Sequence, residues 1–480
     1  MLQNHISVLI ELFIAFKGKE PKSISKIPQS GSDRSYYLIE VDDETFIGTY
    51  SENIKENKAF IYCSHHFQTK NLNTPKVLIS NKECTAYLQE FVGRESLLDK
   101  LEQKKPNDEV FNLYKKSLKQ LITVQIKGDD GFDYNQCITA KEFGKEAILA
   151  DLLYFKYYFL DTLQYPYDKQ KLLKEFELLA DYLHHAEHKY FMFRDFQSRN
   201  ILIKEDDVFF IDYQGGMKGA LQYDVASLLW QAKAELSNEW KESLLNYYID
   251  ELEHQLQSSI NKSTFINRYY GYVLIRLLQV LGAYGFRGLF ERKAHFLASI
   301  PLGLNNLKYF VDHIKLGIET PEFDKILQFV TSENIIKKFT PSTANQETKL
   351  KIVINSFSYK KAIPQDDSGN GGGFVFDMRG ILNPGRKEEY KKLSGKDKPV
   401  MDYLEQETLM NRYLNSVWDL IDINVEDYLN RDFEHLQINF GCTGGQHRSV
   451  FAAEQTARHL KNKYKIQVEL THLNQEHWVK

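Results

Sequence analysis

Apolar and polar positions repeat along the chain with two periods, one typical of strands and one typical of helices. The places where the period changes indicate the boundaries of the folded regions. Before about residue 93, segments with alternating polarity, such as residues 35–41 and 46–50, predict strands, after an amphipathic helix over residues 8–16. From about Asn107 the helical period dominates, which predicts a large helical lobe. Beyond residue 348, strand-like segments alternate with helix-like ones, at residues 351–357, 374–378, 437–440 and 467–471.

This patterning predicts two folded regions separated by a linker. Residues 331–348 are polar, contain Pro341 and lack sustained apolar periodicity, as interdomain linkers often do. We therefore expect a strand-rich lobe at residues 1–92, a helical lobe at 93–330, the linker at 331–348 and a further domain at 349–480. The fold class is α+β for the two-lobed part, followed by an α/β doubly wound domain.

Composition limits the kinds of function that the chain can have. Its 480 residues are 42% hydrophobic and 13% aromatic, which fits globular domains and excludes disorder. Lys and Arg total 61 against 65 Asp and Glu, and residues 349–480 hold 19 basic and 18 acidic side chains. Because sequence-independent binding of polyanions needs a basic excess, nucleic acid is not an expected partner.

Cysteine usage and the first apolar segment indicate the compartment. The four cysteines are too few and too scattered for a disulfide framework or a metal site: Cys63, Cys84, Cys137 and Cys442. The apolar segment at residues 8–16 contains Glu11 and is followed by Lys17 rather than by a cleavage site. We expect a cytoplasmic protein with no membrane partner.

The strongest candidate chemistry lies at residues 193–200, Phe-Arg-Asp-Phe-Gln-Ser-Arg-Asn, and at Asp212 after a strand-like segment. Phosphoryl transfer needs a carboxylate that orients the attacking hydroxyl, and oxygen ligands that hold Mg²⁺ on the nucleotide phosphates. Asp195 supplies the first, and Asn200 and Asp212 supply the second. The alternative is an Asx-rich turn that only caps local backbone groups.

The spacing of Asp195, Asn200 and Asp212 resembles the catalytic and metal-binding loops of the protein-kinase-like aminoglycoside phosphotransferase family. The resemblance covers about residues 1–330 and implies ATP and Mg²⁺ as cofactors, with Asp195 catalytic and Asn200 and Asp212 on the metal. It also implies that Tyr223-Asp224 follows the metal aspartate as a structural brace of the catalytic loop.

The ATP-binding half of this pattern is less regular. The loop that covers the phosphates corresponds to residues 31–37 and gives Ser32, Asp33 and Arg34 as ATP contacts. The next strand, residues 46–50, lacks the usual Lys that pairs with a helix Glu, here Glu52 or Glu56. Arg34 either replaces that cation or is a solvated loop residue.

The segment between the two lobes and the acceptor side complete the kinase pattern. Residues 87–93 resemble the inter-lobe segment, which gives Gln89 and Phe91 as adenine contacts, unless they form a plain edge strand. Residues 33–37, 276–282 and 296–301 resemble AmgK-type kinases, which phosphorylate N-acetylmuramate and N-acetylglucosamine at the 1-hydroxyl. That resemblance implies a small-molecule sugar acceptor in cell-wall recycling, with Glu146 and Asp151 as substrate contacts. The alternative is that residues 145–154 form the exposed face of a scaffold helix.

A second candidate site lies at residues 440–449, Phe-Gly-Cys-Thr-Gly-Gly-Gln-His-Arg-Ser, between a strand and a helical segment. Glycines let backbone N–H groups converge at a helix N-terminus, and polar side chains add donors, which predicts an anion site. The predicted contacts are Thr443, Gly444, His447, Arg448 and Ser449. The alternative is a glycine-rich turn that binds no ligand.

Two families share features with this loop. Cys442 and Arg448 have the spacing with which tyrosine phosphatases surround a phosphate, so phosphatase activity is one alternative. Residues 350–478 follow the motif order of the RapZ C-terminal domain, which implies a phosphosugar ligand and possible homo-oligomers through this domain. Asp377 and Arg379 would then form the adjoining wall of the pocket, and His472 lies at a strand end nearby. No P-loop motif of the kind found in RapZ proteins occurs in the chain.

The leading hypothesis is an ATP-dependent small-molecule kinase for an amino-sugar, fused to a phosphosugar-sensing domain. The alternative from a different class is a non-catalytic regulator or adaptor that binds nucleotide and metabolite. Retention of Asp195, Asn200 and Asp212 argues for catalysis, whereas the missing strand Lys argues for the regulator.

Overall fold

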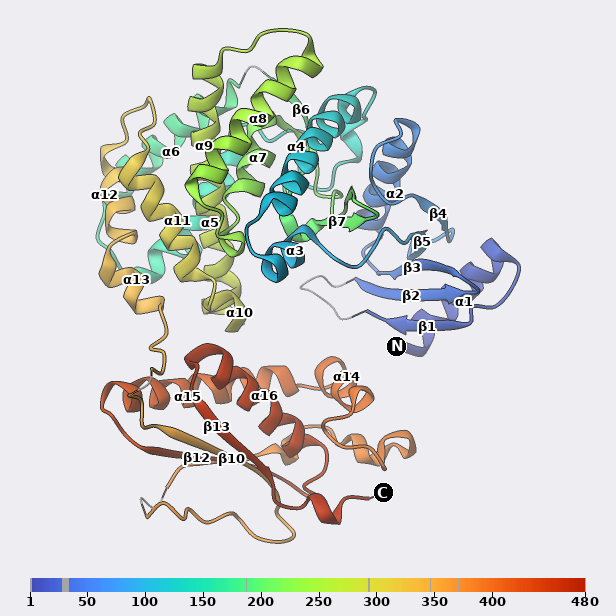
Figure 1. Ribbon diagram of the computed structural model, residues 1–480, viewed down its shortest axis with the longest axis vertical. Coiled ribbons are helices and arrows are strands. Elements are labelled where there is room, and N and C mark those ends of the chain that lie inside the picture. Colours follow the sequence, from blue (N-terminus) through green and yellow to red (C-terminus); the bar gives the residue numbers. More distant parts are fainter. Residues whose placement is uncertain are drawn as a thin grey trace. The chain divides into compact units, whose positions relative to one another are not determined.

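The computed structural model describes residues 2–27, 34–186, 188–291, 294–345, 347–369 and 372–479, and it divides into two compact units (Figure 1). The first unit comprises Met1–Phe286 and Leu302–Ser332, and the second comprises Arg287–Pro301 and Glu333–Lys480. Within the predicted linker, residues 333–339 form a short helix, α13 (Glu333–Phe339), whose Ile335 is buried. The second unit therefore includes one segment, Arg287–Pro301, that sequence patterning placed in the helical lobe.

A five-stranded antiparallel sheet forms the first lobe, with strands in the order β1-β2-β3-β5-β4. The apolar face of the first helix packs on this sheet, so that Leu9 and Phe13 meet Tyr37 and Leu88 in a buried core. The elements are α1 (Leu2–Lys17), β1 (Ser23–Lys26), β2 (Ser35–Val41), β3 (Glu44–Tyr50), α2 (Ile54–Thr69), β4 (Val77–Ser80) and β5 (Ala86–Glu90).

Helices dominate the second lobe, as the period of 3.6 predicts. The pairs α5 with α9, α4 with α8 and α7 with α9 pack side by side (Figure 1). The helices are α3 (Leu97–Lys104), α4 (Asp108–Asp129), α5 (Lys145–Tyr158), α6 (Lys169–His184), α7 (Leu221–Leu229), α8 (Asn238–Leu256), α9 (Lys262–Tyr284), α11 (Ile300–His313) and α12 (Pro321–Val330). A short helix, α10 (Ala294–Leu297), lies in the segment that belongs to the second unit.

Two short antiparallel pairs of strands interrupt the helical lobe and hold the candidate chemistry. β6 (Lys189–Met192) pairs with β9 (Met217–Ala220), and β7 (Ile201–Lys204) pairs with β8 (Asp207–Phe210). The loop from β6 to β7 ends in a single 3-10 turn, Ser198–Asn200. Asp195, Asn200 and Asp212 therefore lie on connections between short, partly buried strands.

All four strands of the last domain are parallel, in the order β11-β12-β10-β13. The elements are β10 (Lys351–Ser358), β11 (Phe374–Asp377), α14 (Lys398–Gln406), α15 (Met410–Asn430), β12 (His435–Cys442), α16 (Arg448–Tyr464) and β13 (Gln467–His472). One core joins the sheet to all three helices, which lie along one face in Figure 1. On the other face a polar network, with hydrogen bonds from Asn355 and Gln437 to Asn439, replaces the second helical layer of a doubly wound sheet.

Helix α9 and its continuation, Lys262–Phe290, form the single helix in the described ranges that is long and apolar enough to cross a membrane. Its side chains Leu277, Leu278 and Leu281 are almost fully buried among the other helices. The apolar composition of α9 is thus explained by its position in the core of the helical lobe.

Candidate functional site

The backbone of the catalytic-loop region is unusual at the two positions that frame it. Arg194 has a φ of 77° and Asp212 a φ of 65°, both in the left-handed region. Side chains with a Cβ rarely adopt this conformation, although Asp tolerates it better than most, so the surrounding contacts must hold the chain there. Asp195 directly follows the first of these two positions, and Asp212 is the second.

The structure brings together the three side chains predicted for phosphoryl transfer. The Asn200 side-chain amide donates to the Asp195 carbonyl oxygen at 2.9 Å and to Asp212 Oδ2 at 3.3 Å. Gln214 Nε2 donates to the other oxygen, Asp212 Oδ1, at 2.8 Å. The contact with Asp195 is to its backbone carbonyl, and the negative charge of the Asp195 carboxylate also acts on Asp212, so the amide and both aspartates form one cluster.

Arg276, from the middle of α9, controls the charge of Asp195. Its Nη2 lies 3.1 Å from Asp195 Oδ1, and the arginine side chain is buried. Burial alone would raise the pKa of Asp195, but the positive charges of Arg276 and Arg194 outweigh it and hold that pKa below its ordinary value. Asp195 is therefore ionised, well oriented and weakly basic.

Asp212 has the opposite electrostatic surroundings. Its side chain reaches solvent, yet the surrounding protein and then the negative charge of Asp195 raise the pKa of Asp212 above its ordinary value. Two carboxylates that repel each other in this way stabilise a cation placed between them.

Asp224, at the start of α7, braces the catalytic loop as the resemblance implied. Its buried carboxylate accepts the backbone N–H groups of Phe193 at 2.9 Å and Arg194 at 3.1 Å, and the amide of Gln125 at 3.3 Å. Burial raises the pKa of Asp224 to about 7 despite these hydrogen bonds. The brace acts on the two residues immediately before Asp195.

A second chain of contacts connects the strand-rich lobe to the metal-side aspartate. The Arg34 guanidinium lies 3.1 Å from Glu56 on α2, and Gln214 Nε2 lies 3.4 Å from the same Glu56 oxygen. Since Gln214 also donates to Asp212, the contacts run from Arg34 to the catalytic loop. Of the two predicted helix acids, Glu56 is the one paired with the buried Arg34; the predicted ATP contacts Ser32 and Asp33 lie outside the described residues.

The other predicted kinase residues differ in how they are placed. Gln89 is buried on β5, and Phe91 follows that strand half-buried, where the chain passes toward the helical lobe. Asp151 is 7% exposed and its Oδ1 accepts from Arg194 at 2.6 Å, while its Oδ2 is buried and has no partner in the described part of the chain. Glu146 is exposed in the first turn of α5 and, among the described residues, makes no hydrogen bond or ion pair with the Asp195 cluster.

The second site is a loop between β12 and α16 that several side chains hold in shape. Ser358 Oγ donates to the Thr443 carbonyl at 2.7 Å, and Trp478 Nε1 donates to the Gly445 carbonyl at 2.9 Å. Gly395 lies so close that a Cβ there would be 2.2 Å from the His447 carbonyl oxygen. Thr443 and Gly444 remain exposed at the tip of the loop, where a ligand has access.

Arg448, the first residue of α16, is buried, and backbone carbonyls hold its guanidinium. Its Nη1 donates to the carbonyls of Arg379 at 3.1 Å and Ile381 at 2.8 Å, while its Nε is buried without a partner in the described ranges. Burial lowers the pKa of Arg448, and the nearby charge of Arg386 lowers it further. No described carboxylate forms an ion pair with this guanidinium, which leaves its charge for an anion.

His447 and Ser449 flank Arg448 with different roles. His447 Nε2 lies 2.9 Å from the Tyr390 carbonyl, so it donates there, and burial lowers the pKa of His447, which favours the neutral ring. A Cβ at position 385 would be 3.0 Å from His447 Cε1, which explains the glycine found there. Ser449 is fully buried and its Oγ lies 3.1 Å from Cys442 Sγ, so it organises the loop from beneath.

The residues that the RapZ resemblance placed beside this loop are also near it. Arg379 forms a two-pronged ion pair with Asp377, with Nε 2.9 and 3.0 Å from the two carboxylate oxygens, and stacks on Tyr359. His472 Nδ1 lies 2.8 Å from Ser356 Oγ, and its Nε2 lies 3.2 Å from Glu454. His472 is thus a paired structural residue, which agrees with the ordinary expectation for a histidine at a strand end.

Comparison with known families identifies two regions of the chain. Residues 23–257 match the phosphotransferase enzyme family. Residues 350–476 match the RapZ C-terminal domain. These matches confirm the two predicted resemblances and the fold class, a kinase-like two-lobed domain followed by an α/β domain with a parallel sheet; the AmgK-type resemblance stays a prediction.

Individual relatives resemble the chain over part of their length. The nucleotide-binding protein XCV3122 of Xanthomonas euvesicatoria is 37% identical over 128 residues, which is 27% of this chain and 44% of that protein. A nucleotide-binding protein of Glaesserella parasuis is 30% identical over 189 residues, 39% of this chain and 64% of that protein. The chain therefore spans less than two thirds of these relatives. Among solved structures, choline kinase from Cryptosporidium parvum Iowa II has a TM-score of 0.47 and 14% identity, covering 68% of this chain and 99% of that one.

Some site residues had no signal of their own in the sequence. Gln214 belongs to none of the motifs described above, yet it connects Glu56 to Asp212. The same holds for Gln231, whose Oε1 accepts from the Ser198 backbone N–H at 2.8 Å and hydroxyl at 2.6 Å. Both are common polar residues, and only their position in the fold gives them a role.

Proposed function

We propose that the chain is an ATP-dependent small-molecule kinase whose acceptor is the anomeric hydroxyl of an amino-sugar. The carrying observation is the cluster of Asp195, Asn200 and Asp212, linked through Gln214 to the Arg34–Glu56 ion pair. The match of residues 23–257 to the phosphotransferase family supports the reaction class. N-acetylmuramate and N-acetylglucosamine are the proposed acceptors.

Asp195 would orient the acceptor hydroxyl and receive its proton. Because Arg276 holds the pKa of Asp195 low, this carboxylate is a weak base that takes the proton late. An anomeric hydroxyl is more acidic than an ordinary alcohol, so a weak and well-oriented base suits it. The Asp151 Oδ2, buried without a partner in the described part of the chain, is the oxygen proposed to bind an acceptor hydroxyl.

The donor set at the cluster fits Mg²⁺. Asp212 supplies carboxylate oxygens and Asn200 its amide Oδ1, the ligands that Mg²⁺ prefers, while Asn200 Nδ2 keeps its hydrogen bond to the Asp195 backbone carbonyl. The described residues contain no group of three His, Cys, Asp or Glu side chains suited to a metal, so substrate phosphates and water would supply the remaining ligands. The ion would neutralise phosphate charge during transfer. Asn200 and Asp212 would hold it, and Arg34 would bind a phosphate oxygen while Glu56 keeps its guanidinium in place.

ADP release tests the kinase proposal directly. Mg²⁺-ATP is offered with N-acetylmuramate, N-acetylglucosamine, an aminoglycoside or choline, using wild type, Asp195→Asn and the exposed control Asp250→Asn. We expect turnover with an amino-sugar, a fall of at least about a hundredfold in Asp195→Asn, and no change in the control. Phosphorus NMR of the product distinguishes a 1-phosphate from a 6-phosphate. Turnover that survives Asp195→Asn would refute the catalytic role, and no turnover with any acceptor would favour the non-catalytic regulator.

We also propose that the last domain binds a phosphosugar at the β12–α16 loop. The buried Arg448, without a carboxylate partner among the described residues, the helix N-terminus and the exposed Gly444 backbone support this ligand class. Calorimetric titration with glucosamine-6-phosphate should show binding that weakens at least about tenfold in Arg448→Ala. Arg458→Ala, an exposed arginine on the same helix, is the matched control. Equal affinity in wild type and Arg448→Ala would refute the pocket.

Phosphate-ester hydrolysis by Cys442 is the second candidate activity for this loop. Hydrogen bonds to its Sγ favour it: the Gly445 backbone N–H lies at 3.2 Å and Ser449 Oγ at 3.1 Å. The thiol is 2% exposed, however, which favours a structural role within the binding loop. Release of phosphate from a sugar phosphate by wild type, lost in Cys442→Ser, would establish the hydrolase; its absence leaves the binding role.

A further inference from the structure

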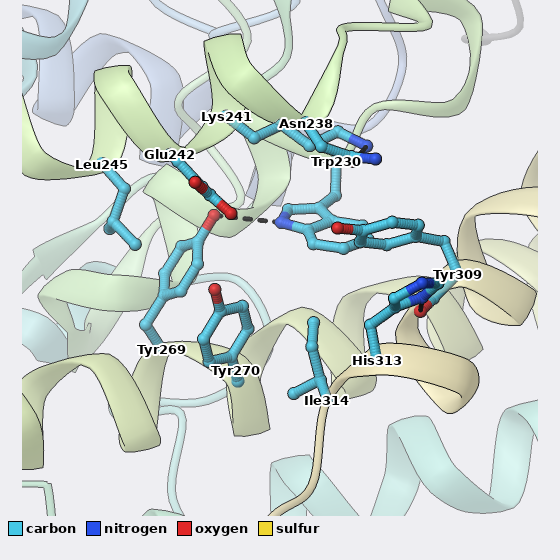
Figure 2. A pocket seen from close by; sticks show the side chains of 10 residues that line it. All are labelled: Trp230, Asn238, Lys241, Glu242, Leu245, Tyr269, Tyr270, Tyr309, His313 and Ile314. Atoms are coloured by element: carbon cyan, nitrogen blue, oxygen red, sulfur yellow. Dashed lines mark hydrogen bonds between the residues drawn. The ribbon is translucent and has the colours of Figure 1, made fainter.

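A cavity in the helical lobe, separate from both sites, contains an unusual lysine. It has a volume of about 110 Å³ and lies between the end of α7 and helices α8, α9 and α11. Figure 2 shows its lining, in which the rings of Trp230, Tyr269, Tyr270 and Tyr309 surround the space near Lys241. Aromatic rings therefore share the lining of one small cavity with the amine of Lys241 and with the polar side chains of Asn238, Glu242 and His313.

Lys241 is buried without a negative partner. Its residue is 9% exposed, and its Nζ lies 4.2 Å from the centre of a Trp230 ring and 5.9 Å from that of Tyr309. The oxygen contacts of Nζ are two long ones, to amide oxygens of Asn238 at 3.4 Å and Asn306 at 3.5 Å. No described carboxylate forms an ion pair with it. Buried charges in proteins are normally paired, so an ammonium beside an open cavity indicates a place for an anion.

We propose that this cavity binds a small planar carboxylate, whose charged group pairs with Lys241 and whose apolar body lies against the rings of Trp230, Tyr270 and Tyr309. Burial lowers the pKa of Lys241 to about 8, so the group is largely protonated at neutral pH. The other titratable side chains that line the cavity are Glu242, His313 and the tyrosines Tyr269, Tyr270 and Tyr309. The negative charge of Glu242 opposes a second charge on the ligand, which favours a monoanion.

The walls of the cavity connect to the catalytic loop. Trp230 is held by hydrogen bonds from its Nε1 to the Tyr269 hydroxyl at 3.0 Å and from Asn306 Nδ2 to its carbonyl at 3.2 Å. The next residue, Gln231, accepts two hydrogen bonds from Ser198, the first residue of the turn that ends at Asn200. A ligand against Trp230 therefore acts one residue away from a contact that positions Asn200. If the chain is the proposed kinase, this connection makes the cavity a regulatory site. That extension rests on the proposed function, whereas binding of the carboxylate to the cavity does not.

Binding is tested by calorimetry with benzoate as the anionic probe, benzamide as its neutral counterpart and benzylammonium as its cationic one. We expect benzoate to bind at least about tenfold more tightly than benzamide, the range of a charge-assisted hydrogen bond. Lys241→Met should abolish this preference, whereas Lys233→Met should keep it, because Lys233 is exposed and is not among the residues that line the cavity. If Lys241→Met does not fold, Glu242→Gln serves instead and should bind benzoate more tightly than wild type. Absence of saturable benzoate binding, unchanged affinity in Lys241→Met or Glu242→Gln, or tighter binding of benzylammonium would each overturn the proposal.

The regulatory extension has a readout that does not depend on kinase activity. Amide hydrogen exchange of residues 195–201 should change when benzoate binds, and Gln231→Leu should remove that change without removing benzoate binding. If exchange there is unaffected in wild type, the cavity binds its ligand without coupling to the catalytic loop, and the extension is overturned. If exchange responds but no acceptor is ever phosphorylated, the kinase proposal fails and this coupling stands.

Discussion

The buried carboxylate of Asp224 should make the stability of the kinase-like domain depend on pH in a way that one substitution removes. Burial raises the pKa of Asp224 from 3.8 to about 7, so the folded state binds this proton more tightly than the unfolded state does. A raised folded-state pKa stabilises the protein at low pH, and that stability is lost as the pH rises toward 7. Integrating the difference between the two pKa values gives a loss of about 2–3 kcal/mol between pH 5 and pH 8.

Asp224→Asn removes this proton and keeps the shape of the side chain. We therefore expect the free energy of unfolding of wild type, relative to Asp224→Asn, to fall by about 2–3 kcal/mol from pH 5 to pH 8. Urea unfolding followed by tryptophan fluorescence measures it, in a background with Trp418 and Trp478 replaced by Phe so that only the first unit reports. The free energy of unfolding of Asp250→Asn, a change at an exposed position, should depend on pH in the same way as that of wild type. Parallel curves for Asp224→Asn as well would mean that Asp224 is ionised in the folded protein throughout this range, and the reasoning would be wrong.

Two further substitutions test the electrostatics and the packing. Arg276→Gln should raise the pKa of Asp195, because the neighbouring positive charge is lost, and so move the acidic limb of the kcat profile to higher pH; an unmoved limb would exclude this role for Arg276. Gly285→Ala should lower the free energy of unfolding by about 2 kcal/mol, because its Cβ would lie 2.1 Å from the Tyr158 carbonyl oxygen. The control Gly317→Ala has no atom within 4 Å of the added Cβ and should change stability by less than about 0.5 kcal/mol in urea unfolding. Similar losses in the two glycine variants would contradict the steric argument.

Local patterning predicted several of the strands, because alternation and burial agree there, but it gave no signal for the four-residue strands β1, β4, β6 and β9. The strand predicted at residues 35–41 has the same first and last residues as β2. The strand predicted at residues 467–471 is one residue shorter than β13. The cluster of Asp195 and Asn200 was also predictable, since a single loop and turn carry both residues and their spacing reflects that turn. Where the residues in contact are close in sequence, the sequence alone is enough to predict their arrangement.

Contacts between distant segments could not be predicted in the same way. The Arg276 side chain reaches Asp195 because α9 packs next to α5 and α7, and nothing near either residue in the sequence indicates that pairing. The buried polar face of the last sheet illustrates the same limit. Asn355 and Asn439 read as ordinary strand residues, and their hydrogen bond at 3.0 Å exists only once two strands from separate segments pair. Such features depend on the tertiary fold, which periodicity does not determine.

The parallel sheet of the last domain also determines the order in which that domain can assemble. Its central strand β10 pairs with β12 and β13, and bonded side chains on these strands are 84 and 116 residues apart in the chain. A ribosome therefore makes β10 long before either neighbour exists, and until then both of its edges are free to pair with other chains. The kinase-like domain precedes it in the chain and can fold during that interval. Synthesis of the β12–α16 loop thus coincides with closure of the sheet, so a phosphosugar bound there would stabilise the step at which a nascent chain is most exposed to aggregation.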